Sequence, residues 1–248
     1  MFLTRPSRGS CERSPGYSAI VIAILILFLS PTPGLPSQIH FDIDTPTTGS
    51  ISWAGGEAPL VGSDIEVDQV MGLGTPNYPD VAYSVTDGEL DFQTGKCLDV
   101  IDEGPFYRWT FAGGGWITLT GGVDFDGDGS NIPTGTLLMD GEFSFCEVTY
   151  MDFYGAEKKW SVTFASFTDD KAEGLTTHYG MPSGLYNGNF NISFEAEDDD
   201  PTDGFESSDV LSGDISNYAI IPAPAAAWLL GSGLIGLVVV RRRLDKGQ

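Results

Sequence analysis

Histidine and cysteine are both scarce in this sequence. The chain of 248 residues holds two histidines, His40 and His178, and three cysteines. So few histidines exclude a His-rich metal site, and the absence of a Gly-x-Ser-x-Gly motif argues against a nucleophilic serine. We therefore interpret both histidines as ordinary surface or core residues and predict that the protein is not an enzyme.

Basic residues are equally sparse between the two ends of the chain. Residues 38–240 contain five Lys and Arg against 33 Asp and Glu, which gives a net charge of −28. Binding nucleic acid requires a basic face that neutralises phosphates, so nucleic acid is excluded as a partner. A segment this acidic should stay soluble, repel its own copies and attract divalent cations.

Sustained helical periodicity is missing between residues 38 and 217. Short alternating or β-branched runs recur instead, each followed by Gly, Asp, Asn or Pro, which is typical of strands and turns. Their spacing, together with 32 glycines in the chain, predicts an all-β domain over residues 38–196, an antiparallel β-sandwich or jelly roll. The expected strands cover residues 51–53, 65–71, 81–85, 90–94, 107–111, 116–120, 136–139, 142–150, 159–167 and 190–195.

Turn residues mark bends within this domain, and a shift in composition marks its end. Asn187-Gly188 favours a hairpin turn, and the run of three glycines at 113–115 favours a bend or bulge. Residues 197–217 are rich in Asp and Ser, so we expect an acidic linker there, with Val210, Leu211 and Ile215 as a possible final strand.

Long apolar runs occur only near the two ends of the sequence. Three arginines precede the apolar residues 19–29, and small residues and prolines follow. This order is typical of a secretory signal peptide, which we place at residues 1–37, with an uncleaved anchor as the alternative.

The second run, residues 225–240, is uncharged and would span about 24 Å as a helix. Pro222 and Pro224 set the start of this helix. Three arginines follow and should remain in the cytoplasm, so this transmembrane helix leaves the body of the protein outside. The alternative is a buried core helix.

The C-terminal residues 218–248 resemble a PEP-CTERM sorting signal of the Val-Pro-Leu-Pro-Ala type. Ala223 stands where the common form of the signal has Glu. The resemblance implies processing by an exosortase-like enzyme at the inner membrane and export to the cell surface beside exopolysaccharide. The residues that match the signal are Ile221, Pro222, Ala223, Pro224 and Ala225, followed by Arg241, Arg242 and Arg243.

Two cysteines lie within the body of the protein, Cys97 and Cys146, because Cys11 falls in the signal peptide. Outside the cell they could form one disulfide that closes a loop of about 50 residues and contributes a few kcal/mol. A pair of buried thiols is the alternative.

The motif with the most definite chemistry is an acidic turn formed by Asp124, Asp126 and Asp128, closed by Gly129. Alternate carboxylates followed by glycine can surround one calcium ion. An EF-hand is excluded because Gly135 occupies the position where that loop has its bidentate Glu. Backbone carbonyls, Asn131 or Asp140 would have to complete the site, and a plain acidic turn is the alternative.

Aromatic residues raise the possibility of carbohydrate binding. Most tryptophans in a domain of this size are core residues, so two exposed rings on one face would be needed to support a sugar site. We expect an exported surface or extracellular-matrix protein associated with exopolysaccharide, with a carbohydrate-binding or carbohydrate-active module as the alternative. The candidate rings are Trp53, Trp109, Trp116, Tyr78, Tyr107, Tyr179 and Tyr186.

Overall fold

The computed structural model describes residues 37–129, 131–151, 159–196 and 202–220. The signal peptide expected at residues 1–37 lies outside this part of the chain apart from Ser37, and the sorting motif and tail helix lie outside it entirely. Among the residues described, no helix combines the length and the apolar composition needed to cross a membrane.

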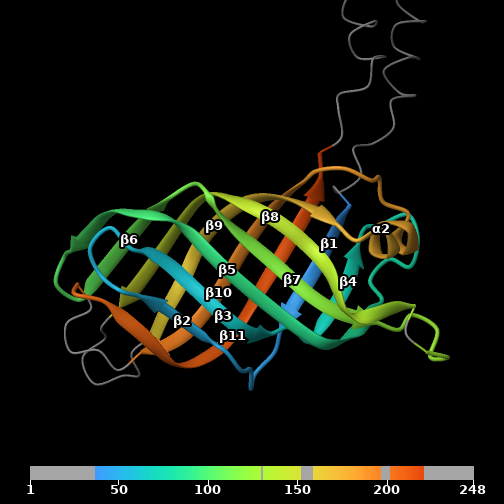
Figure 1. Cartoon of the computed structure of the whole chain (residues 1–248), viewed down its shortest axis with the longest axis horizontal. Coiled ribbons are helices and arrows are strands. Elements are labelled where there is room, and N and C mark those ends of the chain that lie inside the picture. The colour runs from blue at the N-terminus through green and yellow to red at the C-terminus, as the bar shows by residue number, and fades with distance from the viewer. Residues whose placement is uncertain (1–36, 130, 152–158, 197–201, 221–248) are drawn as a thin grey trace, which may run out of the picture. The chain divides into compact units, whose positions relative to one another are not determined.

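Strands dominate the described ranges, with one short helix between the ninth and tenth (Figure 1). The bounds are β1 Gln38–Ile43, β2 Ser50–Trp53, β3 Pro59–Glu66, β4 Gln69–Leu73, β5 Ala82–Asp102, β6 Phe106–Ala112, β7 Gly115–Val123, β8 Ile132–Met151, β9 Lys159–Lys171, α2 Glu173–Tyr179, β10 Tyr186–Ala196 and β11 Phe205–Ala219.

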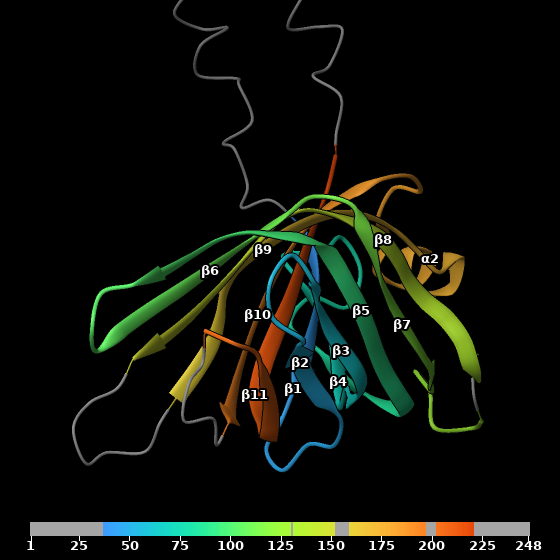
Figure 2. The same cartoon turned by 60° about the vertical axis from the view of Figure 1, so that its left-hand side comes forward.

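The strands form one antiparallel sheet that closes on itself. At one end the order is β1, β4, β5, β7, β8, β9, β10 and β11, and β11 pairs again with β1. At the other end β2 and β3 replace β1 and β4, while β6 replaces β7 between β5 and β8. Figures 1 and 2 show the strands wrapping round a common interior.

Alternation along each strand fills this interior. In β1 the residues Ile39, Phe41 and Ile43 are buried, and the residues between them are half-buried. Aromatic rings occupy much of the core; for example, Trp160 stacks on Trp109 with centroids 5.1 Å apart. Each side chain buried in this way contributes about 1.5–3 kcal/mol through the hydrophobic effect, so the core is what holds the closed sheet together.

The predicted all-β antiparallel fold is confirmed. The sandwich-like packing comes from a single closed sheet, because every described strand belongs to one hydrogen-bonded set. The strands expected at 81–85 and 90–94 are both parts of β5, and those expected at 136–139 and 142–150 are both parts of β8. Asn187-Gly188 lies inside β10, so the hairpin expected there is wrong, and α2 was not expected.

The final strand expected at Val210, Leu211 and Ile215 is present as β11, and it takes up most of the segment predicted as an acidic linker. This strand runs from Phe205 to Ala219 and pairs along its length with β10, while β1 and β2 pair with its other side. Residues 197–201 lie outside the described ranges. The domain therefore extends beyond residue 196 to the end of β11.

The two cysteines are free thiols in the structure, so the disulfide expected between them is not formed. Cys97 of β5 and Cys146 of β8 are both in register with Phe111 of β6, which lies between them. Two strand spacings amount to about 9.6 Å, and a disulfide requires Cα atoms closer than about 7 Å. Burial raises the pKa of both thiols, which keeps them protonated and unreactive.

Candidate binding site at the helical end of the sheet

Helix α2 lies at one end of the sheet (Figure 1). Gly180 ends it in a left-handed conformation with φ 66° and donates its N–H to the carbonyl of Thr177, a conformation that glycine adopts without strain. Leu175 and Tyr179 face the core, and the Tyr179 hydroxyl donates to the carbonyl of Val70 at 3.3 Å. These contacts fix the orientation of the opposite side of the helix.

The imidazole of His178 lies between two aromatic rings. Phe125 stacks on it at 3.7 Å with an interplanar angle of 5°, and Tyr78 stacks at 4.3 Å with an angle of 7°. Two parallel rings this close must occupy opposite faces of the imidazole. Tyr83 packs edge-on against His178. The loss of water around the ring lowers the pKa of His178.

The acidic turn predicted from the sequence lies beside this stack. Asp124 accepts the N–H of Gly127 at 2.8 Å and that of Asp126 at 3.3 Å through one carboxylate oxygen. Asn131 donates its amide N–H to Asp126 at 3.0 Å. This hydrogen bond lowers the pKa of Asp126, whereas the contact with Asp126 raises the pKa of Asp128.

The three predicted calcium ligands are brought together. Asp124, Asp126 and Asp128 each place one carboxylate oxygen within 4.8 Å of the others, and all three are exposed. Asn131 joins the turn, as the sequence suggested. Asp140 does not, because it pairs with Thr118, which lies six residues, or about 20 Å of strand, before the start of the turn. Backbone carbonyls and water would have to complete a calcium shell.

A pocket of about 550 Å³ lies where the acidic turn meets α2. Its lining combines aromatic rings with two carboxylates, an amide and a hydroxyl. It can therefore take a ligand that has both an apolar face and several hydrogen-bond donors. The residues that line it are Tyr78, Phe125, Asp126, Asn131, Ile132, Glu173, Gly174, Thr177 and His178.

The candidate aromatic residues divide between core and surface. Trp53, Trp109, Tyr179 and Tyr186 are buried, as the usual role of such residues suggests, and Tyr107 is partly buried. Tyr78 is 55% exposed and borders the pocket. Trp116 is 43% exposed but lies on β7, outside the pocket lining. The two exposed rings among the candidates therefore do not border the same pocket, and Tyr78 is the one exposed candidate ring that lines it.

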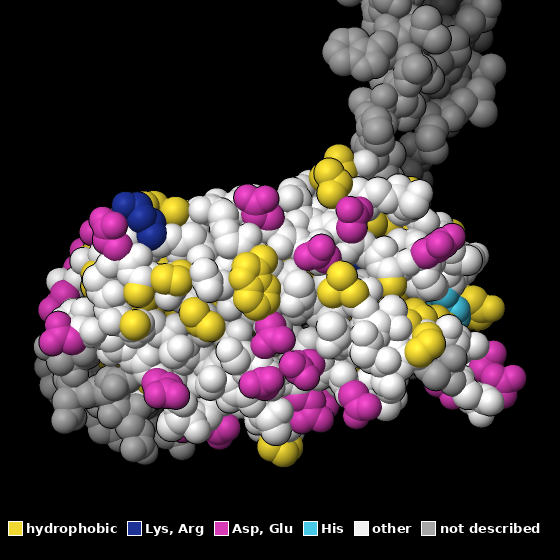
Figure 3. All heavy atoms as spheres, viewed as in Figure 1, with side chains coloured by type: hydrophobic (Ala, Val, Ile, Leu, Met, Phe, Trp, Pro, Cys, Tyr) yellow, Lys and Arg dark blue, Asp and Glu magenta, His cyan; other side chains and the backbone are white. Residues whose placement is uncertain are grey.

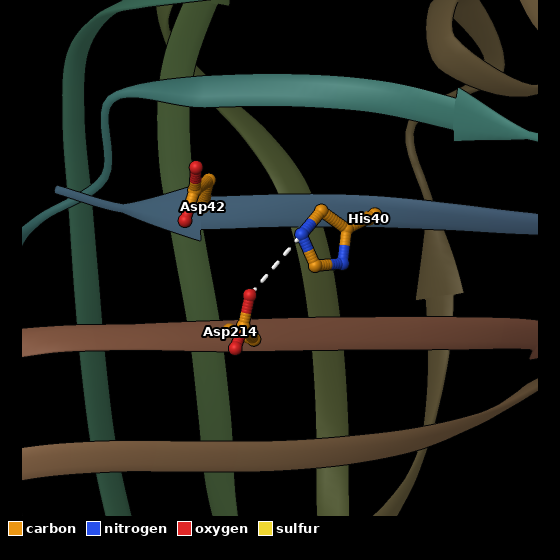
Figure 4. A group of neighbouring side chains, drawn as sticks. All are labelled: His40, Asp42 and Asp214. Carbon is orange, nitrogen blue, oxygen red and sulfur yellow. Dashed lines mark ion pairs between the residues drawn. The ribbon is translucent and has the colours of Figure 1, made fainter. Parts of the chain in front are cut away.

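A second cluster lies on the outer face of the sheet, where β1 pairs with β11 (Figure 4). Nε2 of His40 is 3.2 Å from Oδ1 of Asp214, and Nδ1 is 3.1 Å from the hydroxyl of Ser216. Asp42 completes a set of three side chains that could hold a metal ion. Burial, followed by the charges of Asp44 and Asp214, raises the pKa of Asp42. One imidazole and two carboxylates suit a divalent transition metal.

Acidic side chains are spread over the face of the molecule in Figure 3, with few basic ones beside them. Asp64, Glu89 and Asp91 form a third acidic group. The charge of Asp91 is the main cause that raises the pKa of Glu89. The described surface therefore carries several groups of carboxylates that repel one another.

Comparison with protein-family models, curated proteins and solved structures gave no match for this chain.

Proposed function

We propose that this protein is an exported bacterial surface or extracellular-matrix protein whose folded part binds polysaccharide and catalyses no reaction. The pocket bordered by Tyr78, Asp126, Asn131 and Glu173 is the observation that supports this function. The exposed ring of Tyr78 offers an apolar face to the C–H groups of a sugar. Carboxylate and amide oxygens beside it accept hydrogen bonds from sugar hydroxyls.

The export part of the proposal is supported by the order of the signals at the two ends of the sequence. The segment before residue 38 directs translocation, and the apolar residues 225–240 hold the precursor in the inner membrane. An exosortase-like enzyme then recognises residues 221–225 and processes the tail. The folded part is released to the cell surface, beside the exopolysaccharide that the pocket binds.

Calcium is proposed as a structural partner of the same pocket. Asp124, Asp126 and Asp128 supply oxygen ligands, and Phe125 lies between two of them in the sequence. An ion at this turn would fix Phe125 against His178 and so hold the aromatic lining of the pocket in place.

The experiment is affinity electrophoresis of the full-length protein through gels that contain neutral or acidic polysaccharides. Replacing Tyr78 by Ala removes the exposed ring, worth about 1.4 kcal/mol, so the dissociation constant should rise about tenfold. Trp116→Ala is the matched control, because it removes an exposed ring outside the pocket. Failure to bind any polysaccharide, or equal loss in both variants, would contradict the proposal.

A further inference from the structure

A polar network is enclosed in the core between β9 and β11. Nζ of Lys171 is in direct contact with Oδ2 of Asp169, and both side chains are fully buried. The other oxygen, Oδ1 of Asp169, accepts a hydrogen bond from Nδ2 of Asn217 at 2.7 Å. A single carboxylate therefore holds a primary amine at one oxygen and a primary amide at the other.

The amine of Lys171 lies close to two aromatic rings of the core. Nζ is 5.5 Å from the ring centroid of Tyr186 and 5.8 Å from that of Phe41. Tyr186 belongs to β10 and Phe41 to β1, and these strands flank β11 on its two sides. The amine therefore lies in the interior near the strands on either side of β11, and Asn217 of β11 faces the same interior.

Gly188 of β10 gives Asn217 room to reach towards β9. The two residues are in register, and a Cβ atom at Gly188 would come within 2.7 Å of Nδ2 of Asn217. Because this side chain is missing, the amide can extend across β10 to Asp169. The sequence of β10 thus permits a contact between two strands that are not neighbours.

Two features make this network reactive rather than merely polar. Burial lowers the pKa of Lys171 well below its usual value, which favours the neutral amine, the nucleophilic form. Oδ1 of Asn217 is buried and has no hydrogen-bond partner among the described residues. A buried unpaired carbonyl oxygen is uncommon in folded proteins and requires an explanation, such as a chemical role.

We propose that Lys171 and Asn217 condense into an intramolecular isopeptide bond, with Asp169 as the proton carrier. Nζ attacks Cγ of Asn217, and a new C–N bond forms while the bond from Cγ to Nδ2 breaks. The ammonium proton of Lys171 first moves to Asp169, which leaves the amine neutral for the attack. Asp169 then gives this proton to Nδ2 and takes a second proton from Nζ, so that ammonia leaves and Asp169 ends protonated. An amine and an amide become a substituted amide and ammonia, so the reaction needs no oxidant, metal or cofactor.

The bond would tie β9 directly to β11 across β10. Asn217 lies two residues before the end of β11 at Ala219, and the chain then continues into the C-terminal tail. Tension applied through an anchored tail would reach β11 first, and the bond would pass it on to β9. This mechanical role rests on the proposed sorting of the tail, whereas the bond itself does not.

Mass spectrometry of the purified full-length protein tests the bond, because condensation removes one ammonia. We expect an intact mass lower by one ammonia than the sequence requires. Trypsin should leave residues 160–241 as one peptide, lighter by one ammonia, with no cleavage after Lys171. Further digestion at glutamate should then give a branched peptide in which residue 171 is joined to residue 217, because Glu173 and Glu206 lie between them. Linear peptides from both segments would overturn the proposal, and so would loss of one water, which would indicate a bond between Lys171 and Asp169.

Two variants distinguish the condensation reaction from an ion pair between Lys171 and Asp169 that only stabilises the fold. Asp169→Asn keeps the amine and the amide but removes the proton carrier, so the unreacted mass should return. Lys96→Met is the control, because Lys96 pairs with Glu57 on the surface, and it should keep the branched peptide. A branched peptide in Asp169→Asn would overturn the role of Asp169. If that variant does not fold, the digest of the wild type still shows whether the bond is present. The bond does not depend on polysaccharide binding, so failure to bind polysaccharide would not contradict it.

Discussion

His178 has surroundings that make its protonation costly. Its imidazole is enclosed between Phe125 and Tyr78, and burial lowers its pKa below the ordinary 6.5. The folded protein therefore binds a proton less readily than the unfolded chain. The stabilising effect of the neutral ring is complete above about pH 6.5 and is lost as the pH falls from there to the folded pKa.

Replacing His178 by Gln should remove this pH dependence. Between about pH 7.5 and pH 5, the free energy of unfolding of the wild type should fall relative to that of the variant. The difference should be less than about 1 kcal/mol, because the ring is partly exposed. Urea unfolding of both proteins at the two pH values measures it. If the free energies of unfolding of the two proteins differ by the same amount at both pH values, His178 keeps its ordinary pKa.

Part of the candidate site could be predicted from the sequence, because its residues are neighbours in the chain. The alternate spacing of Asp124, Asp126 and Asp128 is enough to predict that their side chains point to the same side. Tyr78 and His178 come from distant segments, and no local pattern shows that their rings stack. The prediction of a disulfide was wrong for a similar reason, since sequence spacing cannot reveal that β6 lies between β5 and β8.

Among the strands, β11 shows how composition can hide a regular element. Its inward positions include Phe205 and Ile215, but also Gly213 and Asn217, and its outward positions are mostly Ser and Asp. The apolar alternation is therefore weak, and the sequence indicated only the strand at Val210, Leu211 and Ile215, not the full length of β11. In β5 the difficulty is local, because Asp87 has φ 49° at a bulge and divides one strand into two apparent ones. Helix α2 is too short to show periodicity.

Phe205 tests whether β11 belongs to the folded domain. Its ring lies 4.6 Å from that of Trp160, 5.5 Å from Trp109 and 5.9 Å from Trp53. Phe205→Ala should reduce the free energy of unfolding by about 3–5 kcal/mol, because it leaves a cavity among these rings. Urea unfolding measures the loss. Ser212→Ala is the control on the exposed side of β11. An equally small effect of both changes would show that this segment is a linker and not part of the folded domain.

The charge of the whole domain gives a prediction that no single residue carries. With a net charge of −28 between residues 38 and 240, the carboxylates repel one another in the compact state more than in the unfolded chain. Raising sodium chloride from about 10 mM to about 150 mM shortens the Debye length from about 30 Å to about 8 Å. The melting temperature should therefore rise.

Calcium chloride at the same ionic strength should raise the melting temperature further if an ion occupies the acidic turn. Asp126→Asn should lose this additional increase and keep the increase caused by sodium chloride. Thermal melting of both proteins in the two salts separates screening from binding. An equal rise of the wild-type melting temperature in the two salts would show that the turn does not bind calcium specifically.

The closed pairing of the sheet also limits how copies of this protein can assemble. Every described strand has a hydrogen-bonded neighbour on both sides, so the described part of the backbone offers no template onto which another chain could add a strand. Crowded copies should consequently resist growth into amyloid-like fibrils, and a layer built from them would depend on side chains and bound molecules for its cohesion.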